Sequence, residues 1–163
     1  MRIALIAIIT ACALLGCKEN ASGAPSGAAS AVAKQGKTVS AELTGYNHTD
    51  KTIAAFYVNG EWGGNITPGS GGGKFVCCVD IPKPWQEGYT VTVTWEDHEL
   101  KAQKREVLVP RYDAAKAGGM NVHFLRSGEI KVFVGMTFLG HPDYPLKGKE
   151  AELKPGVPID IHN

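Results

Sequence analysis

The densest group of ionisable side chains in the sequence is Glu96-Asp97-His98-Glu99. A pair of carboxylates beside a histidine is suited to general acid–base catalysis. The group, however, follows a segment of strand pattern and precedes Lys101-Ala102-Gln103-Lys104, which is typical of a solvated hairpin turn. The serines lie outside any Gly-x-Ser-x-Gly motif, and His-Glu-x-x-His does not occur. The sequence therefore favours a protein that is not an enzyme.

Two cysteines, Cys77 and Cys78, are adjacent. Neighbouring side chains of a regular strand point to opposite faces, so a bond between these two needs a distorted or cis peptide. Two interpretations stay open: a pair of small buried thiols, or a vicinal disulfide that forms a rigid kink beside a ligand surface in an oxidising compartment. Adjacent cysteines lack the spacing of a chelating pair and the histidines are scattered, so we expect neither a metal nor a cofactor.

A glycine-rich segment, Gly69-Ser70-Gly71-Gly72-Gly73-Lys74, looks at first like half of a phosphate-binding loop. It lacks the required residues, because Pro68 stands where that motif has its first glycine and Phe75 stands where it has Ser or Thr. Such glycines also let a partner approach the backbone closely, and Trp62 and Asn65 lie nearby in the sequence. We therefore expect an exposed recognition loop.

The N-terminus carries an export signal. Met1-Arg2 is followed by an apolar run that is too short to span a membrane and suits a signal-peptide core. The run ends at Leu14-Leu15-Gly16-Cys17, which resembles the bacterial lipobox, so residues 1–16 are predicted to be removed and Cys17 to be lipidated. An uncleaved anchor and a plain secretory peptide are the alternatives. Lys18 in place of an inner-membrane retention Asp implies sorting to the outer membrane and leaves the facing side undetermined. The location we expect is the outer membrane, facing the periplasm.

The rest of the chain divides into a tether and one domain. Residues 17–37 hold the lipidated cysteine and an Ala, Ser and Gly stretch that has almost no large apolar side chain to offset its ordering entropy. Residues 38–163 are enough for one core. Loss of Arg2 with the signal peptide leaves basic and acidic side chains equal in number, which gives no reason to expect nucleic acid as a partner.

Alternation of apolar and polar residues dominates the domain, most plainly over Tyr89–Trp95, where three threonines share one face. Asn59-Gly60 predicts a tight hairpin turn, and the segment Asp113–Ala117 is the one short helix expected. These signals predict an all-β antiparallel sandwich of immunoglobulin-like architecture with about eight short strands. The other expected strands are 39–43, 53–58, 75–81, 105–109, 121–125, 128–134 and 159–162.

An ordered set of motifs between Gly45 and Trp95 resembles an uncharacterised family of proteobacterial lipoproteins. The set comprises Gly45-Tyr46-Asn47-His48-Thr49-Asp50, Val58-Asn59-Gly60, Gly71-Gly72-Gly73 and Cys77-Cys78-Val79. Members of that family are often encoded near type VI secretion genes and phospholipase-like effectors. The resemblance therefore implies an immunity role and carries over no catalytic residue.

Both lines of inference favour binding over catalysis. The first hypothesis is an immunity lipoprotein that sterically inhibits a type VI secretion phospholipase effector. The alternative is a structural or accessory lipoprotein of the envelope or of a secretion apparatus. The residues expected to contact the protein partner are Tyr46, Asn47, Asn59, Trp62, Asn65, Gly71, Gly72, Gly73 and Lys74.

Overall fold

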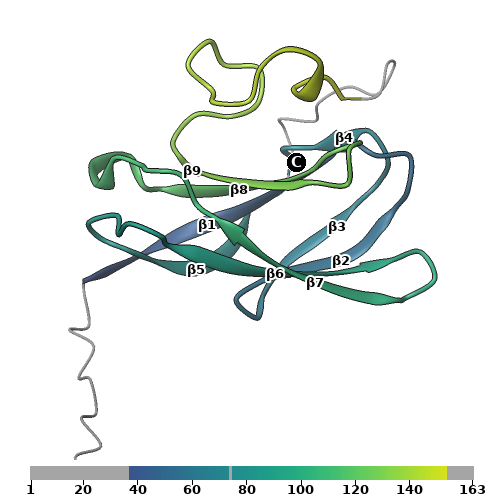
Figure 1. Cartoon of the computed structure of the whole chain (residues 1–163), viewed down its shortest axis with the longest axis horizontal. Helices are drawn as coiled ribbons and strands as arrows, with labels where there is room; N and C mark the ends of the chain where they lie inside the picture. Colours follow the sequence, from purple (N-terminus) through teal and green to yellow (C-terminus); the bar gives the residue numbers. More distant parts are fainter. Residues whose placement is uncertain (1–36, 74, 154–163) are drawn as a thin grey trace, which may run out of the picture. The chain divides into compact units, whose positions relative to one another are not determined.

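The computed structural model describes residues 37–73 and 75–153, and these residues form the expected all-β sandwich (Figure 1). The predicted signal peptide, Cys17, the tether, Lys74 and the strand expected at 159–162 lie outside the described residues. The strands are β1 (Thr38–Asn47), β2 (Ile53–Val58), β3 (Glu61–Ile66), β4 (Ser70–Gly71), β5 (Val76–Pro82), β6 (Thr90–Asp97), β7 (Ala102–Leu108), β8 (Gly119–Phe124) and β9 (Ile130–Gly135).

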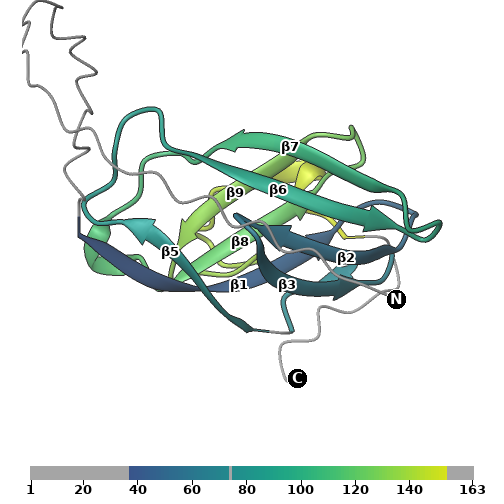
Figure 2. The same cartoon turned by 90° about the horizontal axis from the view of Figure 1, so that it is seen from below.

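The strands make two sheets. In sheet A, β1 is central: it pairs with β4 and β5 on one side and with β8 on the other, and β9 follows β8. Sheet B has the order β3-β2-β6-β7, and β6 and β7 lie in front of β8 and β9 when the sandwich is viewed from below (Figure 2). The pairing of β1 with β8 is parallel, whereas the other pairings are antiparallel. The sandwich is therefore confirmed, but it is not purely antiparallel as expected.

Local sequence explains the individual elements. In β6, Val91, Val93 and Trp95 are buried between the sheets while the threonines between them face outward. Asn59 and Gly60 have φ of 52° and 92° and form the β2–β3 turn, as Asn-Gly favours. The predicted short helix is a 3-10 turn, η1 (Ala114–Lys116), in which the amide of Ala115 donates to the Asp113 carboxylate. A second 3-10 turn is η2 (Gly148–Glu150).

Phe56 fills the centre of the main core, between the two sheets. Its ring lies against Gly63 of sheet B, where an added Cβ would meet ring atom Cε2 at 2.1 Å. It also lies against Gly45 of sheet A, where a Cβ would meet Cε1 at 2.7 Å. Phe124 packs on the same ring edge to face, with centroids 5.8 Å apart. Glycine at 45 and 63 is thus a packing requirement of the sandwich.

A second apolar cluster lies on the outer face of sheet A. There, the residues that follow β9, Met136–Leu153, fold back over the sheet (Figure 1). We call them the C-terminal segment. Its side chains Leu139, Tyr144 and Leu146 are buried against Tyr46 of β1 and Leu125. The outer face of sheet A is therefore covered around Tyr46, whereas the outward side chains of Ser40 and Glu42 at the other end of β1 are exposed.

Candidate functional site

Two residues expected at a partner interface, Tyr46 and Asn47, are completely buried. The ring of Tyr46 stacks on His123, with centroids 4.5 Å apart and planes within 2°. The side-chain amide of Asn47 donates hydrogen bonds to the carbonyls of Lys51 (2.7 Å) and Ile66 (3.2 Å). Their expected role as partner contacts was wrong, because the C-terminal segment covers the outer face of sheet A around Tyr46 and Asn47 fixes the loop that follows β1.

The triple glycine also serves the fold. Gly71 has a φ of 144° and pairs with Tyr46, and a Cβ on it would lie 2.4 Å from the carbonyl oxygen of Gly45. Gly72 and Gly73 are buried, and the amide of Gly72 donates to the same Gly45 carbonyl at 3.2 Å. The exposed recognition loop expected here was wrong, because these glycines let the chain pack closely against β1. Lys74 lies outside the described residues.

Asn59 is exposed but has a structural partner. Its side-chain oxygen accepts a hydrogen bond from the amide of Thr92 at 2.8 Å, and its own amide donates to the carbonyl of Thr92. These two bonds join the β2–β3 turn to β6. Asn59 therefore supports the position of the hairpin that carries Trp62.

Trp62 and Asn65 lie where a partner can reach them. Both are exposed on β3 at the edge of sheet B, and the indole of Trp62 is 52% exposed. Trp62 pairs across the sheet with Tyr57 of β2. Tyr57 pairs in turn with Thr94 of β6, and Thr94 pairs with Lys104 of β7. These four residues form a row across the outer face of sheet B that we call the Trp62 face. An exposed Trp beside a Tyr is the composition typical of binding hot spots.

A second exposed apolar group lies on sheet A. Phe75, just before β5, packs edge to face against Phe138 of the C-terminal segment, with ring centroids 5.5 Å apart. Both rings are nearly half exposed, and Met136 is 62% exposed. A side chain at Gly118 would meet the sulfur of Met136, so this glycine allows Met136 to lie flat on the sheet.

Cys77 and Cys78 form a disulfide in the structure. They lie in a bulge of β5 between the pairings of Ala41 with Val79 and of Leu43 with Val76. Cys77 is exposed and Cys78 is half-buried, so these are not two buried thiols. Of the two interpretations that the sequence left open, the structure has the vicinal disulfide.

The acidic group that suggested catalysis is a turn. The carboxylate of Asp97 accepts hydrogen bonds from the amides of Glu99 (2.9 Å) and Lys101 (3.1 Å). These bonds, that of Lys101 first, lower the pKa of the Asp97 carboxyl. His98 and Glu99 point into solvent on the β6–β7 hairpin. Asp97 shapes the turn, as the lysine-rich sequence after it suggested.

The structure contains a buried polar network that the sequence did not predict. His48 Nε2 lies 3.0 Å from His123 Nδ1, and His123 Nε2 lies 2.5 Å from the hydroxyl of Tyr144. At the other end, His48 Nδ1 lies 3.1 Å from the carbonyl oxygen of Glu152. All three side chains are at most 1% exposed. Burial lowers the pKa of His48, and it lowers the pKa of His123 well below its ordinary value, so both rings are neutral at pH 7.

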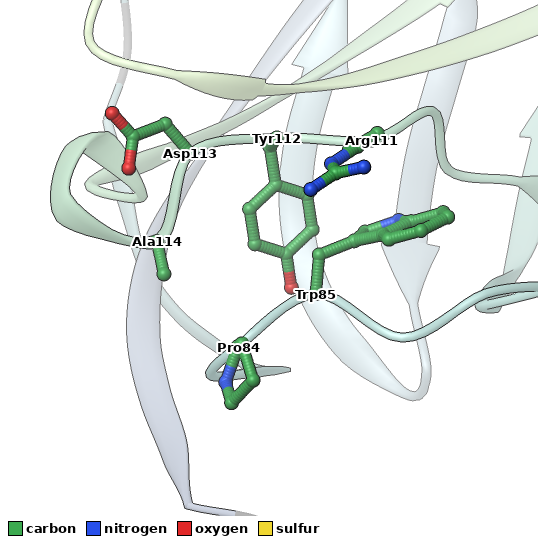
Figure 3. A pocket seen from close by; sticks show the side chains of 6 residues that line it. All are labelled: Pro84, Trp85, Arg111, Tyr112, Asp113 and Ala114. Atoms are coloured by element: carbon green, nitrogen blue, oxygen red, sulfur yellow. The ribbon is translucent and has the colours of Figure 1, made fainter.

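A pocket of about 440 Å³ lies between the β5–β6 and β7–β8 connections, lined by Pro84, Trp85, Arg111, Tyr112, Asp113 and Ala114. Two aromatic side chains of the pocket join the two connections by hydrogen bonds. Trp85 Nε1 donates to the carbonyl of Val109 (3.1 Å), and the Tyr112 hydroxyl donates to the carbonyl of Pro82 (2.5 Å). Figure 3 shows Arg111 pointing toward the two rings and Asp113 pointing away from them. The pocket thus presents ring faces and one guanidinium to solvent.

The family comparison matches residues 46–132, which is more than half of the chain, with the family described as "Protein of unknown function (DUF3304)". The chain belongs to the DUF3304 family. The DUF3304 match contains the Trp62 face, the disulfide, His48 and His123, whereas Tyr144 and Glu152 follow it. No curated protein and no solved structure matches the chain.

Among residues 37–73 and 75–153, no three His, Cys, Asp or Glu side chains gather as metal ligands. The same residues hold no helix with the length and apolarity that a membrane crossing requires.

Proposed function

We propose that the protein is an envelope-anchored lipoprotein that binds and sterically inhibits a lipase-type effector of type VI secretion. The lipobox-like Leu14-Leu15-Gly16-Cys17 and the tether that follows it support the anchoring. The motifs between Gly45 and Trp95 support the immunity role through the family they resemble. The membrane is then the second partner, held through the acyl chains on Cys17, in the compartment where a phospholipase effector acts.

The observation that carries the binding function is the exposed indole of Trp62 on the outer face of sheet B. Two hydrogen bonds to Thr92 hold its hairpin in place, so little conformational entropy is lost when a partner covers the face. Tyr57 lies beside Trp62 and provides a second aromatic contact, and Lys104 places a positive charge at the other end of the row. Inhibition of this kind is stoichiometric and requires no chemistry from the inhibitor.

The first test is survival of bacteria that express the neighbouring lipase-like gene product in the periplasm, with and without this protein. Rescue together with co-purification of the two proteins is the expected result. A Cys17→Ala variant tests whether anchoring contributes to rescue. Absence of both rescue and a complex would overturn the immunity proposal for that pair and leave an accessory envelope lipoprotein as the better account.

Trp62→Ala tests the surface itself. We expect effector affinity to fall by about 2 kcal/mol, which is roughly 30-fold, if the indole is a central contact. Leu100→Ala is the matched control, because Leu100 is 70% exposed on the β6–β7 turn, away from the Trp62 face. Isothermal titration calorimetry measures both variants, and equal affinities would remove Trp62 from the interface.

A further inference from the structure

The buried network joins two parts of the fold that are far apart in the sequence. Its two middle members belong to sheet A, since His123 is in β8 and His48 follows β1 directly. Its two ends, the hydroxyl of Tyr144 and the carbonyl of Glu152, belong to the C-terminal segment. The histidines therefore hold the C-terminal segment against the sheet at two points.

The hydrogen-bond partners leave one arrangement of protons for neutral rings. The carbonyl of Glu152 can only accept, so His48 must carry its proton on Nδ1 and offer Nε2 as an acceptor. His123 Nδ1 must then donate to His48 Nε2, which leaves His123 Nε2 to accept from the hydroxyl of Tyr144. Both rings are thus Nδ1–H tautomers, and each polar atom of the chain is satisfied.

One additional proton breaks this arrangement. Protonation of His48 at Nε2 places an N–H opposite the N–H of His123 at 3.0 Å. Protonation of His123 at Nε2 places an N–H opposite the Tyr144 hydroxyl, which must rotate its own hydrogen away. Neither charge reaches water in the closed structure, because both rings are at most 1% exposed.

The surrounding groups act on the two histidines in opposite directions, and the Glu152 carbonyl favours protonation of His48. Arg126 and Lys131 disfavour protonation of His48 and His123 respectively, whereas Glu150 favours it at His48. Glu150 is itself engaged by Lys131 at 2.7 Å. The titratable and charged groups that face the pair are Tyr46 from β1, Asp50 after it, Arg126 after β8, Lys131 from β9, and Tyr144, Lys149 and Glu150 from the C-terminal segment.

We propose that the C-terminal segment is a latch, closed by the neutral His48–His123–Tyr144 chain and released from sheet A by acid. Release uncovers Tyr46, Phe133 and His123, which the segment now buries, and so presents an apolar face that is absent at neutral pH. The Lys131–Glu150 ion pair, on the surface, and the Arg126 bond to the Glu152 carbonyl do not depend on the histidines. The pH response therefore comes from the buried pair.

The size of the response follows from linkage. Consider a histidine that has a pKa of about 6.5 when the segment is released and that binds no proton when the segment is closed. Such a histidine shifts the equilibrium between the closed and released segment by about 30-fold between pH 7.5 and pH 5.0. The two histidines together shift it by up to about 10³-fold. The sign is fixed by the lowered pKa values of both rings: closure is favoured above pH 6.5 and weakens as the pH falls below it.

Hydrogen exchange of the whole protein at pH 7.5 and 5.0 tests the latch, with protection factors corrected for the intrinsic exchange rate. The amide of Leu139, which donates to the Tyr46 hydroxyl, and that of Tyr144 report on the segment. We expect their protection to fall more than tenfold at pH 5.0 while amides of β2 and β6 keep theirs. Unchanged segment protection, or an equal loss in β2 and β6, would overturn the proposal.

Two further measurements separate the latch from general acid sensitivity. His123→Gln should reduce the pH response of the segment to the part that His48 alone supplies, whereas His98→Gln, a change at an exposed histidine of the β6–β7 turn, should retain the full response. If His123→Gln does not fold, long-range ¹H–¹⁵N spectra of the unaltered protein give the tautomers directly. An Nε2–H tautomer at His48 or His123 at pH 7.5 contradicts the proton arrangement and with it the latch.

Discussion

Gly63→Ala is a direct test of how the two sheets pack. The new methyl group would lie 2.1 Å from Cε2 and 2.2 Å from Cζ of Phe56, whereas carbon atoms in contact are about 3.5–4.0 Å apart. The ring cannot move toward sheet A, because its other edge already fills the space beside Gly45. We therefore expect a loss of about 3 kcal/mol in the free energy of unfolding, at the upper end of the range for overpacked cores.

Equilibrium urea unfolding followed by tryptophan fluorescence measures this loss. With an m-value of about 1.5 kcal/mol/M, a change of 3 kcal/mol lowers the midpoint by about 2 M. Gly135→Ala is the matched control, because the nearest heavy atom to its added Cβ is the amide nitrogen of Thr137 at 4.0 Å. Its free energy of unfolding should stay within about 0.5 kcal/mol of the parent value, and equal midpoints for the two variants would refute the packing argument.

The double variant Gly63→Ala/Phe56→Leu provides an internal check. A smaller side chain at 56 makes room for the methyl group, so the two changes should be less costly together than the sum of the single changes. We expect a coupling of about 1–2 kcal/mol, measured from the same unfolding curves. Strict additivity would mean that the cost of Gly63→Ala has another source.

Three other predictions concern single groups. Tyr144→Phe removes the donor to a buried histidine nitrogen and should lower the free energy of unfolding at pH 7.5 by about 1–3 kcal/mol, measured by urea unfolding. Asn59→Ala places at φ 52° a residue that adopts the left-handed region less readily than asparagine, and it removes the bond to β6, so the thermal midpoint should fall by several degrees, whereas the midpoint of Asn59→Asp, which keeps the acceptor, should fall less. Peptide mapping should find Cys77 and Cys78 alkylated by iodoacetamide only after reduction; labelling without reductant would contradict the disulfide.

The strands were predictable because each carries its own signal. Alternation over Tyr89–Trp95 reflects the burial of one face, and Asn59-Gly60 marks a turn by the positive φ that both residues adopt readily. The partnership of β1 with β8 has no such local signal, since it joins residues 42–47 to 119–124 and depends on how the whole chain folds. Strand existence is a local property, whereas strand order is not.

The candidate site was predicted less well for the same reason. Trp62 and Asn65 were placed on the surface and lie there, because the edge strand β3 has few neighbours. Tyr46 was misplaced because the C-terminal segment that buries it has no regular pattern. His48, His123 and Tyr144 are separated by 75 and 21 residues, and no spacing rule connects residues that meet only after two layers have packed.

The disulfide bulge also has a consequence for self-association. β5 pairs only with β1 among the strands that the structure describes, so its other side is a free sheet edge of the kind that recruits a strand from another molecule. With the anchoring proposed above, copies of the protein would meet often, because a membrane would confine them to two dimensions. The bulge at Cys77–Cys78 breaks the regular row of amides and carbonyls along that edge, and Pro82 at its end lacks an amide hydrogen. Both features make edge-to-edge pairing of β5 with a strand of another molecule less favourable.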